Sequence, residues 1–225
     1  MKVLVVAAHP DDEVLGPGGT LRLHSMRGDQ VTAFVACCGT NLRYGTEAER
    51  KLRDASSAVG AVIGFSEVRL GDLPDQGLDT LTLTRVIDPL ERLLDEIRPD
   101  VLYTHFSGDI NRDHRILFEA LAVAARPYAA PFLRRFVSFE TPSSTEWGPS
   151  AGQPPFNPNF FVDISATLEE KIRAFSLYQS EVRPAPHPRS AESLRARAVT
   201  WGSVVGVAAA EAFCVVREMD RDARG

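Results

Sequence analysis

Short apolar runs alternate along the first half of the chain with longer amphipathic segments. Strands are expected where the runs are short and rich in β-branched residues, at 2–8, 30–37, 68–70 and 101–105. Helices are expected where the apolar positions recur with a period of about 3.6, at 19–26, 46–58 and 81–97. This order of elements is typical of a parallel sheet whose two faces are covered by helices.

The second half of the chain is less regular. Strands are expected at 134–140 and 160–164, a helix capped by Ser165 and running to about Tyr178, and a further helical region at 192–212. Between the two strands lies a long stretch rich in proline, serine and glycine, and such a loop in a compact domain is usually functional. We therefore predict one Rossmann-like, three-layer α/β domain over residues 1–225, with a mostly parallel sheet and helices on both faces.

Composition and charge limit the partners of this chain. Its 225 residues, 44% of them hydrophobic, suffice for one well-packed core. A net charge of −5 argues against nucleic acid as a partner. No apolar stretch is long enough to span a membrane, and the start of the chain reads as a strand rather than a signal peptide, which predicts a cytoplasmic protein. The three cysteines lack metal or redox spacing. The sequence does not decide the oligomeric state, and a homo-oligomer is one of the alternatives.

A dense polar cluster follows the first apolar run. The segment His9-Pro10-Asp11-Asp12-Glu13 begins where the run at 2–8 ends, and open α/β sheets place their ligand sites at such strand ends. His9 and Asp12 are three residues apart, close enough to bind one metal ion, whereas Asp11 points elsewhere and is free to act on water. Carboxylates at this position are also typical of a capped helix start. A second polar cluster at the same edge of the sheet is therefore needed before this one indicates a metal site.

The second polar cluster follows the run at 101–105. Asn111-Arg112-Asp113-His114 leads into an apolar helical segment at 116–125. Loops after parallel strands emerge at the same edge of a sheet, so His114 can converge with His9 and Asp12. A catalytic zinc ion takes three protein ligands and keeps one position open. The two clusters therefore predict a zinc site, and imidazole and carboxylate ligands would also accept another divalent metal.

Together these segments resemble the LmbE/PIG-L family of zinc-dependent sugar N-deacetylases. The segment Ala210-Glu211-Ala212-Phe213 resembles one near the end of that family's members. The resemblance implies that His9, Asp12 and His114 bind the metal, and that Asp11 is the general base. It also implies the removal of an N-acetyl group from a 2-acetamido sugar or sugar conjugate by zinc-activated water. The expected partner is a small amino-sugar substrate.

One position departs from the pattern of that family. Many relatives have a histidine three residues before the last ligand, where this chain has Asn111. An amide donates hydrogen bonds but carries no positive charge, so the role in polarising the substrate has to move to another residue. We expect His187, in a proline-rich segment, to take this catalytic role, with His105 as the second choice. Asn111 is then a substrate-binding candidate.

Three further residues are predicted to bind substrate. Arg43 follows the second strand and would reach the same edge of the sheet, where a guanidinium suits hydroxyl or phosphate groups. Glu140 follows a later strand, and Trp147 lies in the long loop, so they suit sugar hydroxyls and a sugar face. Each of these side chains is also common in a purely structural role.

Other functions are less well supported by the sequence. The glycines at 16, 18 and 19 lack the spacing of a dinucleotide-binding loop, and they follow carboxylates that repel a pyrophosphate. A carbohydrate-binding protein of the same fold without activity would not need the full set of metal ligands and base. A zinc hydrolase acting on another amide or an ester stays open as an alternative.

Overall fold

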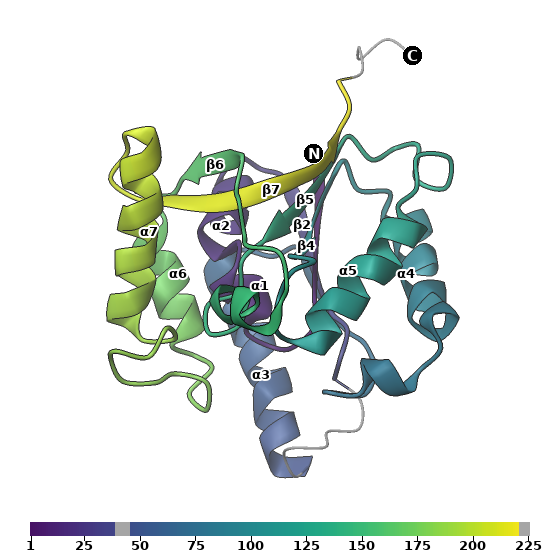
Figure 1. The fold of residues 1–225 in the computed structure, drawn as a ribbon, viewed down its shortest axis with the longest axis horizontal. Coiled ribbons are helices and arrows are strands. Elements are labelled where there is room, and N and C mark those ends of the chain that lie inside the picture. The colour runs from purple at the N-terminus through teal and green to yellow at the C-terminus, as the bar shows by residue number, and fades with distance from the viewer. Residues whose placement is uncertain (39–45, 221–225) are drawn as a thin grey trace.

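The computed structural model describes residues 1–38 and 46–220 and contains one seven-stranded sheet (Figure 1). The strands lie in the order β3-β2-β1-β4-β5-β7-β6. Their bounds are β1 Lys2–Ala7, β2 Gln30–Val35, β3 Glu67–Leu70, β4 Val101–His105, β5 Arg135–Phe139, β6 Phe160–Asp163 and β7 Ala210–Glu218. The first five are parallel, and β7 runs antiparallel to both β5 and β6. The predicted α/β fold with a mostly parallel sheet is thus confirmed.

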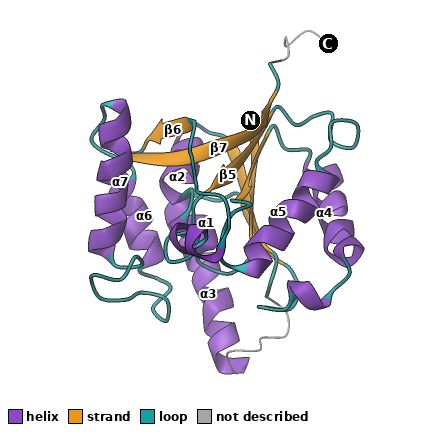
Figure 2. Ribbon diagram, viewed as in Figure 1, coloured by secondary structure: helices purple, strands orange, loops and turns teal. Residues whose placement is uncertain are grey.

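Helices cover both faces of the sheet (Figure 2). Their bounds are α1 Asp12–Leu15, α2 Gly18–Met26, α3 Thr46–Ile63, α4 Leu83–Ile97, α5 Arg112–Ala124, α6 Leu168–Phe175 and α7 Ala191–Val205, with short 3-10 turns η1 Leu78–Thr80, η2 Thr145–Trp147 and η3 Pro149–Ala151. The alternation of side chains in β1 explains the three layers: Leu4 and Val6 pack with α4 and α5, whereas Val3 and Val5 pack with the helices of the other face. Within the described ranges, no helix is long and apolar enough to cross a membrane.

The chain leaves the carboxyl ends of the neighbouring strands β1 and β4 in opposite directions. After β1 the chain turns into α1 and α2 on one face of the sheet, and after β4 it enters α5 on the other face. Such a reversal of direction is where open α/β sheets bind their ligands. Both polar clusters of the sequence lie at this edge.

The predicted helical region at 192–212 is wrong in its last part. Helix α7 ends at Val205, because Gly206 adopts the left-handed conformation with φ of 77° and caps the helix. The chain then enters β7, which inserts between β5 and β6. Glu211 in this strand accepts backbone N–H groups of Gly19 and Thr20, each at 2.8 Å, so the Ala-Glu-Ala-Phe segment anchors the start of α2.

Other element boundaries shift by about a turn. Ser165 bonds Asp163 instead of capping the next helix, and α6 begins only at Leu168. Helix α3 extends five residues beyond the predicted end, to Ile63. Helix α5 begins at Arg112, before the predicted start, because the side chain of Asn111 caps it.

Candidate metal centre and active site

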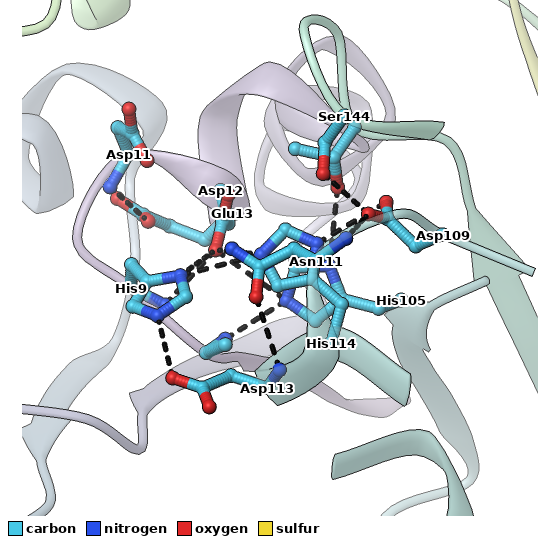
Figure 3. A network of polar contacts seen from close by, with 12 residues as sticks. His9, Asp11, Asp12, Glu13, His105, Asp109, Asn111, Asp113, His114 and Ser144 are labelled. Carbon is cyan, nitrogen blue, oxygen red and sulfur yellow. Dashed lines mark hydrogen bonds and ion pairs between the residues drawn. The ribbon is translucent and has the colours of Figure 1, made fainter. Parts of the chain in front are cut away.

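Three side chains converge at the carboxyl ends of β1 and β4 (Figure 3). His9 follows β1, Asp12 opens α1 and His114 lies in the first turn of α5. The distances joining His9 Nδ1, Asp12 Oδ2 and His114 Nε2 are all 3.2 Å. Ligand atoms of a tetrahedral zinc site, bonded at about 2.0–2.1 Å, stand roughly 3.3 Å apart. The three donors therefore have the chemistry and the spacing of one face of a tetrahedral metal site.

Carboxylates hold the far nitrogen of each of the two imidazoles. His9 Nε2 lies 3.1 Å from Asp113 Oδ2 and 3.2 Å from Asp75 Oδ1. His114 Nδ1 lies 3.2 Å from Asp109 Oδ2. Such carboxylates fix the tautomer in which the other ring nitrogen is free to bind a metal. Asp109 and Asp113 lie within five residues of His114 in the sequence, whereas Asp75 comes from the loop after β3 and has no such signal.

Asp109 is fixed in turn by the loop that follows β5. Thr145 Oγ1 donates a hydrogen bond to Oδ2 at 2.7 Å, and the hydroxyl of Ser144 donates to Oδ1. The backbone N–H of Asn111 also donates to Oδ1, at 2.7 Å. Part of the long loop after β5 thus supports the orientation of His114.

The electrostatics of the cluster favour positive charge. Burial alone would lower the pKa of His114, but Asp12 and Asp109 outweigh it and raise that pKa to about 9. Burial also opposes protonation of His9, yet hydrogen bonds to the surrounding carboxylates raise its pKa well above the ordinary value. For Asp12, burial acts to raise the pKa, and His114 and His105 lower it well below the usual range. A divalent cation would meet the same demand for charge by displacing the imidazole protons.

A second set of donor atoms also lies within 4.8 Å of one another: His9, Cys37 and Asp113. Burial raises the pKa of the Cys37 thiol well above its ordinary value, and a metal requires the thiolate. Backbone N–H groups of Gln76 and Leu78 already donate to Oδ2 and Oδ1 of Asp113, at 2.7 and 3.1 Å. The set that contains Asp12 is therefore the better metal site.

Asp11 occupies an unusual backbone conformation at the turn into α1. Its φ of 114° is rare for a residue with a side chain, and such strain persists only where neighbours enforce it. Glu13 does so, because its Oε2 accepts the Asp11 N–H at 3.0 Å while Tyr178 donates its hydroxyl to Oε1. Burial, opposed by the Tyr178 hydrogen bond, raises the pKa of Glu13 to about 7.

Arg189 contacts the carboxylate of Asp11. Its Nη1 lies 3.0 Å from Asp11 Oδ2 and 2.8 Å from Glu181 Oε2, and its Nε donates to Ser143 Oγ at 2.6 Å. Burial raises the pKa of Asp11 well above its ordinary value, and Arg189 is the main opposing charge. The sequence did not point to this arginine; the catalytic role was predicted for His187, two residues earlier.

The amide of Asn111 lies beside the imidazoles of His9 and His114 (Figure 3). Its Oδ1 accepts the N–H of Asp113 at 3.0 Å, which orients the NH2 group away from the helix. His105 is fully buried and stacks on His114 with ring centroids 3.7 Å apart. Its Nε2 accepts the Ala8 N–H at 2.8 Å, and burial lowers its pKa to about 3. His105 is thus a neutral packing partner of His114.

Four other residues were predicted to act on or bind the substrate, and one of them lies outside the described residues. His187 is half-buried, and its Nδ1 accepts the N–H of Arg189 at 3.1 Å. Glu140 is engaged by α7, through Arg197 and Trp201, each at 2.5 Å. The side chain of Trp147 is 45% exposed. Arg43 lies outside the described residues. The roles predicted for these four side chains stay predictions.

Comparison with known proteins places this site in context. The family model of GlcNAc-PI de-N-acetylase, PIG-L, matches residues 4–125, a range that holds both polar clusters. Among curated proteins, the chain is 28% identical to a probable N-acetyl-alpha-D-glucosaminyl L-malate deacetylase 2 of Bacillus cereus. That similarity covers 80% of this chain and 83% of the relative.

Solved structures share the whole fold. The conserved protein TT1542 of Thermus thermophilus is 25% identical with a TM-score of 0.76, covering 99% of this chain and 98% of that one. The 4-carboxy-2-hydroxymuconate hydratase GalB of Pseudomonas putida KT2440 is 19% identical with a TM-score of 0.74, covering 100% and 99%. Since a hydratase also has this fold, the fold alone does not identify the reaction.

Proposed function

The chain belongs to the PIG-L family of GlcNAc-PI de-N-acetylases, and from this premise we propose that residues 1–225 form one metal-dependent deacetylase domain. The proposed reaction is hydrolysis of the N-acetyl group of a 2-acetamido sugar or sugar conjugate, which yields acetate and a free amine. One observation carries the proposal: His9, Asp12 and His114 present a metal face beside the buried carboxylate of Asp11. That combination suits attack of water on an amide carbonyl.

Zinc is the proposed ion, because two imidazoles and one carboxylate with tetrahedral spacing suit it. When bound, it lowers the pKa of water and polarises the substrate carbonyl. Asp113, hydrogen-bonded to His9 Nε2, and Asp109, 3.2 Å from His114 Nδ1, are proposed to keep the two imidazoles oriented.

Asp11 is the proposed general base. Arg189 engages Oδ2, so Oδ1 accepts the proton of the attacking water. The protonated carboxyl then delivers that proton to the amide nitrogen, which leaves as an amine. Because Asp11 has to be ionised to take up this proton, which it then returns to the leaving nitrogen, we expect kcat/KM to fall as pH drops through the pKa of Asp11.

Substrate contacts are proposed at the rim of the site. The NH2 group of Asn111 is positioned to donate to the substrate carbonyl region, and Glu140, Trp147 and Arg43 are proposed to contact the sugar. His187 is proposed to take the electrophilic role of the histidine that Asn111 replaces. Arg189 is a second candidate for that role, supported by its contact with Asp11.

A substrate panel tests the proposal. Zinc-loaded protein is incubated with N-acetylglucosamine, with its malate and inositol glycosides, and with acetyl esters as controls, and both acetate and primary amine are measured. We expect equal amounts of the two products from at least one acetamido sugar, formed roughly a hundredfold or more slowly by the Asp11→Asn variant. Cleavage of the esters alone would replace the deacetylase proposal with another zinc hydrolase. No turnover of any compound would favour a carbohydrate-binding protein without activity.

A further inference from the structure

A cavity lies at the opposite, amino edge of the sheet, and its lining includes Met1, the end of the chain marked N in Figure 1. Its volume is about 450 Å3, within the range of small-molecule sites. It is lined by the starts of β4, β5 and β6 and by the end of β7. One face of α2 closes it, through Thr20, Leu23, His24 and Arg27, whose spacing places them on a single helical stripe.

The base of the cavity combines apolar walls with fixed polar groups. Val101 and Val162 contribute apolar surface. The hydroxyl of Tyr103 lies 3.1 Å from His24 Nε2, and His24 Nδ1 lies 2.7 Å from Asp29 Oδ2. Because burial lowers the pKa of His24, its Nε2 accepts from Tyr103, and the tyrosine oxygen keeps its acceptor lone pairs.

Thr20 adds an unsatisfied group at this base. It is 2% exposed, and its hydroxyl has no hydrogen-bond partner within the described part of the chain. Buried polar groups are nearly always paired, so a lone hydroxyl beside a cavity indicates a partner that comes from outside the protein.

The rim of the cavity is cationic. Arg27 and Arg134 are exposed and form no ion pair within residues 1–38 and 46–220, whereas Arg135 is neutralised by Glu218 and lies over the ring of Phe160. The lining has two carboxylates; Glu218 pairs with Arg135, so Asp220 alone stands against Arg27 and Arg134. The excess positive charge contrasts with the net charge of −5 of the whole chain.

We propose that this amino-edge cavity binds a small organic anion with an apolar or aromatic body, such as a carboxylate or a phosphate monoester. The body lies between α2 and the starts of β4 and β6, and the anionic group faces Arg27 and Arg134. The cavity and the metal cluster lie at opposite edges of the sheet, so both sites accept ligands at the same time. This inference does not depend on the reaction proposed for the metal cluster.

The test uses 1-anilinonaphthalene-8-sulfonate, a fluorescent aromatic anion, titrated into the full chain. We expect saturable binding that the Arg27→Glu, Arg134→Glu double variant weakens by about tenfold, as the reversal of two exposed charges implies. The matched control is Arg92→Glu with Arg126→Glu, which makes the same charge change at exposed sites of the other face. It should leave the affinity within about twofold of that of the unmodified protein.

Competing small molecules and the His114→Ala variant of the metal cluster complete the test. 3-Phenylpropionate and phenyl phosphate should displace the probe, and the stronger competitor identifies the carboxylate or phosphate class, whereas neutral 3-phenylpropanol should not. Binding should persist in His114→Ala, because the metal cluster lies at the other edge. Absence of saturable binding, equal weakening by both double variants, or loss of binding in His114→Ala would overturn the proposal.

Discussion

The two edges of one sheet both bury a histidine against aspartate, with opposite electrostatic results. At the carboxyl edge, His114 lies 3.2 Å from both Asp12 and Asp109, and its pKa rises to about 9 against the effect of burial. At the amino edge, His24 lies 2.7 Å from Asp29, yet burial prevails and lowers its pKa. A buried His-Asp contact therefore does not by itself indicate a cation site.

The two histidines differ in whether the neighbouring carboxylate is already compensated by another cation. Asp29 also binds the N-terminal ammonium group, with 2.7 Å between Met1 N and Oδ1, so its charge is already compensated. At the carboxyl edge, Asp12, Asp109 and Asp113 surround two imidazoles, and within residues 1–38 and 46–220 none of the three pairs with a lysine, an arginine or an ammonium group. An excess of buried carboxylate over fixed positive charge is what makes that edge suited to a metal ion.

The largest expected effect is on zinc content, compared between one variant at each edge of the sheet. His114→Ala should lose most of the bound zinc and with it the activity. The loss of affinity should exceed the 10- to 100-fold that is typical of residues that only support a ligand. His24→Ala should keep one zinc per chain, measured by elemental analysis after dialysis. Equal zinc content in both variants would remove the distinction between the edges.

The next largest effect is on kcat, compared between a carboxylate variant at each edge. Asp11→Asn should lower kcat by roughly a hundredfold or more with zinc retained, because an amide cannot accept the proton of water. Asp29→Asn, at the amino edge, should change kcat little. Steady-state kinetics on the best substrate of the panel, with zinc content measured alongside, decide the matter. Near-normal turnover of Asp11→Asn would reject this carboxylate as the base.

Arg189 should act through Asp11, with a smaller effect. We expect Arg189→Met to lower kcat by about tenfold, the size of coupling between groups in contact, and Arg189→Lys to recover part of it. In the Asp11→Asn background, Arg189→Met should add little further loss. Additive losses in this double-mutant cycle would mean that Arg189 acts on the fold and not on the base.

The same kinetics rank the residues proposed to replace the missing imidazole. If His187 carries that role, His187→Ala lowers kcat with unchanged zinc content, by several-fold to about tenfold, and Asn111→Ala is milder. The reverse order would assign the role to the Asn111 amide and leave His187 as support for the loop that holds Arg189.

The smallest effect concerns stability at the amino edge. A histidine whose pKa is lowered on folding takes up its proton more readily in the unfolded chain, so it favours the folded state above its ordinary pKa of 6.5 and loses this contribution as pH falls. Urea unfolding at pH 7.5 and 5.5 should therefore show a smaller loss of stability on acidification for His24→Gln than for the unmodified protein. An equal loss in both would mean that His24 does not titrate in this way.

Local sequence sufficed for much of the fold and of the metal cluster. The runs that became β1 and β4 begin with Val3 and Val101 and stay buried to their ends, and the polar residues after them had to lie at one edge of the sheet. His9 and Asp12 are neighbours in sequence, and only the placement of His114 required the topology.

Contacts that join distant segments were not readable from the sequence. Arg189 reaches Asp11 across 178 residues, and its position depends on where the loop between α6 and α7 returns to the sheet. Asp75 reaches His9 from an irregular loop. The boundary between α7 and β7 carried a readable signal in Gly206, whose left-handed conformation ends the helix.

The central claim is that the carboxyl edge, and not the amino edge, holds the catalytic ion. Crystals of the protein soaked in zinc, with anomalous diffraction recorded at the zinc absorption edge, test it directly. The account predicts one dominant peak about 2.0–2.2 Å from His9 Nδ1, Asp12 Oδ2 and His114 Nε2. A dominant peak at His24 and Asp29, or no peak among the three ligands, would contradict it.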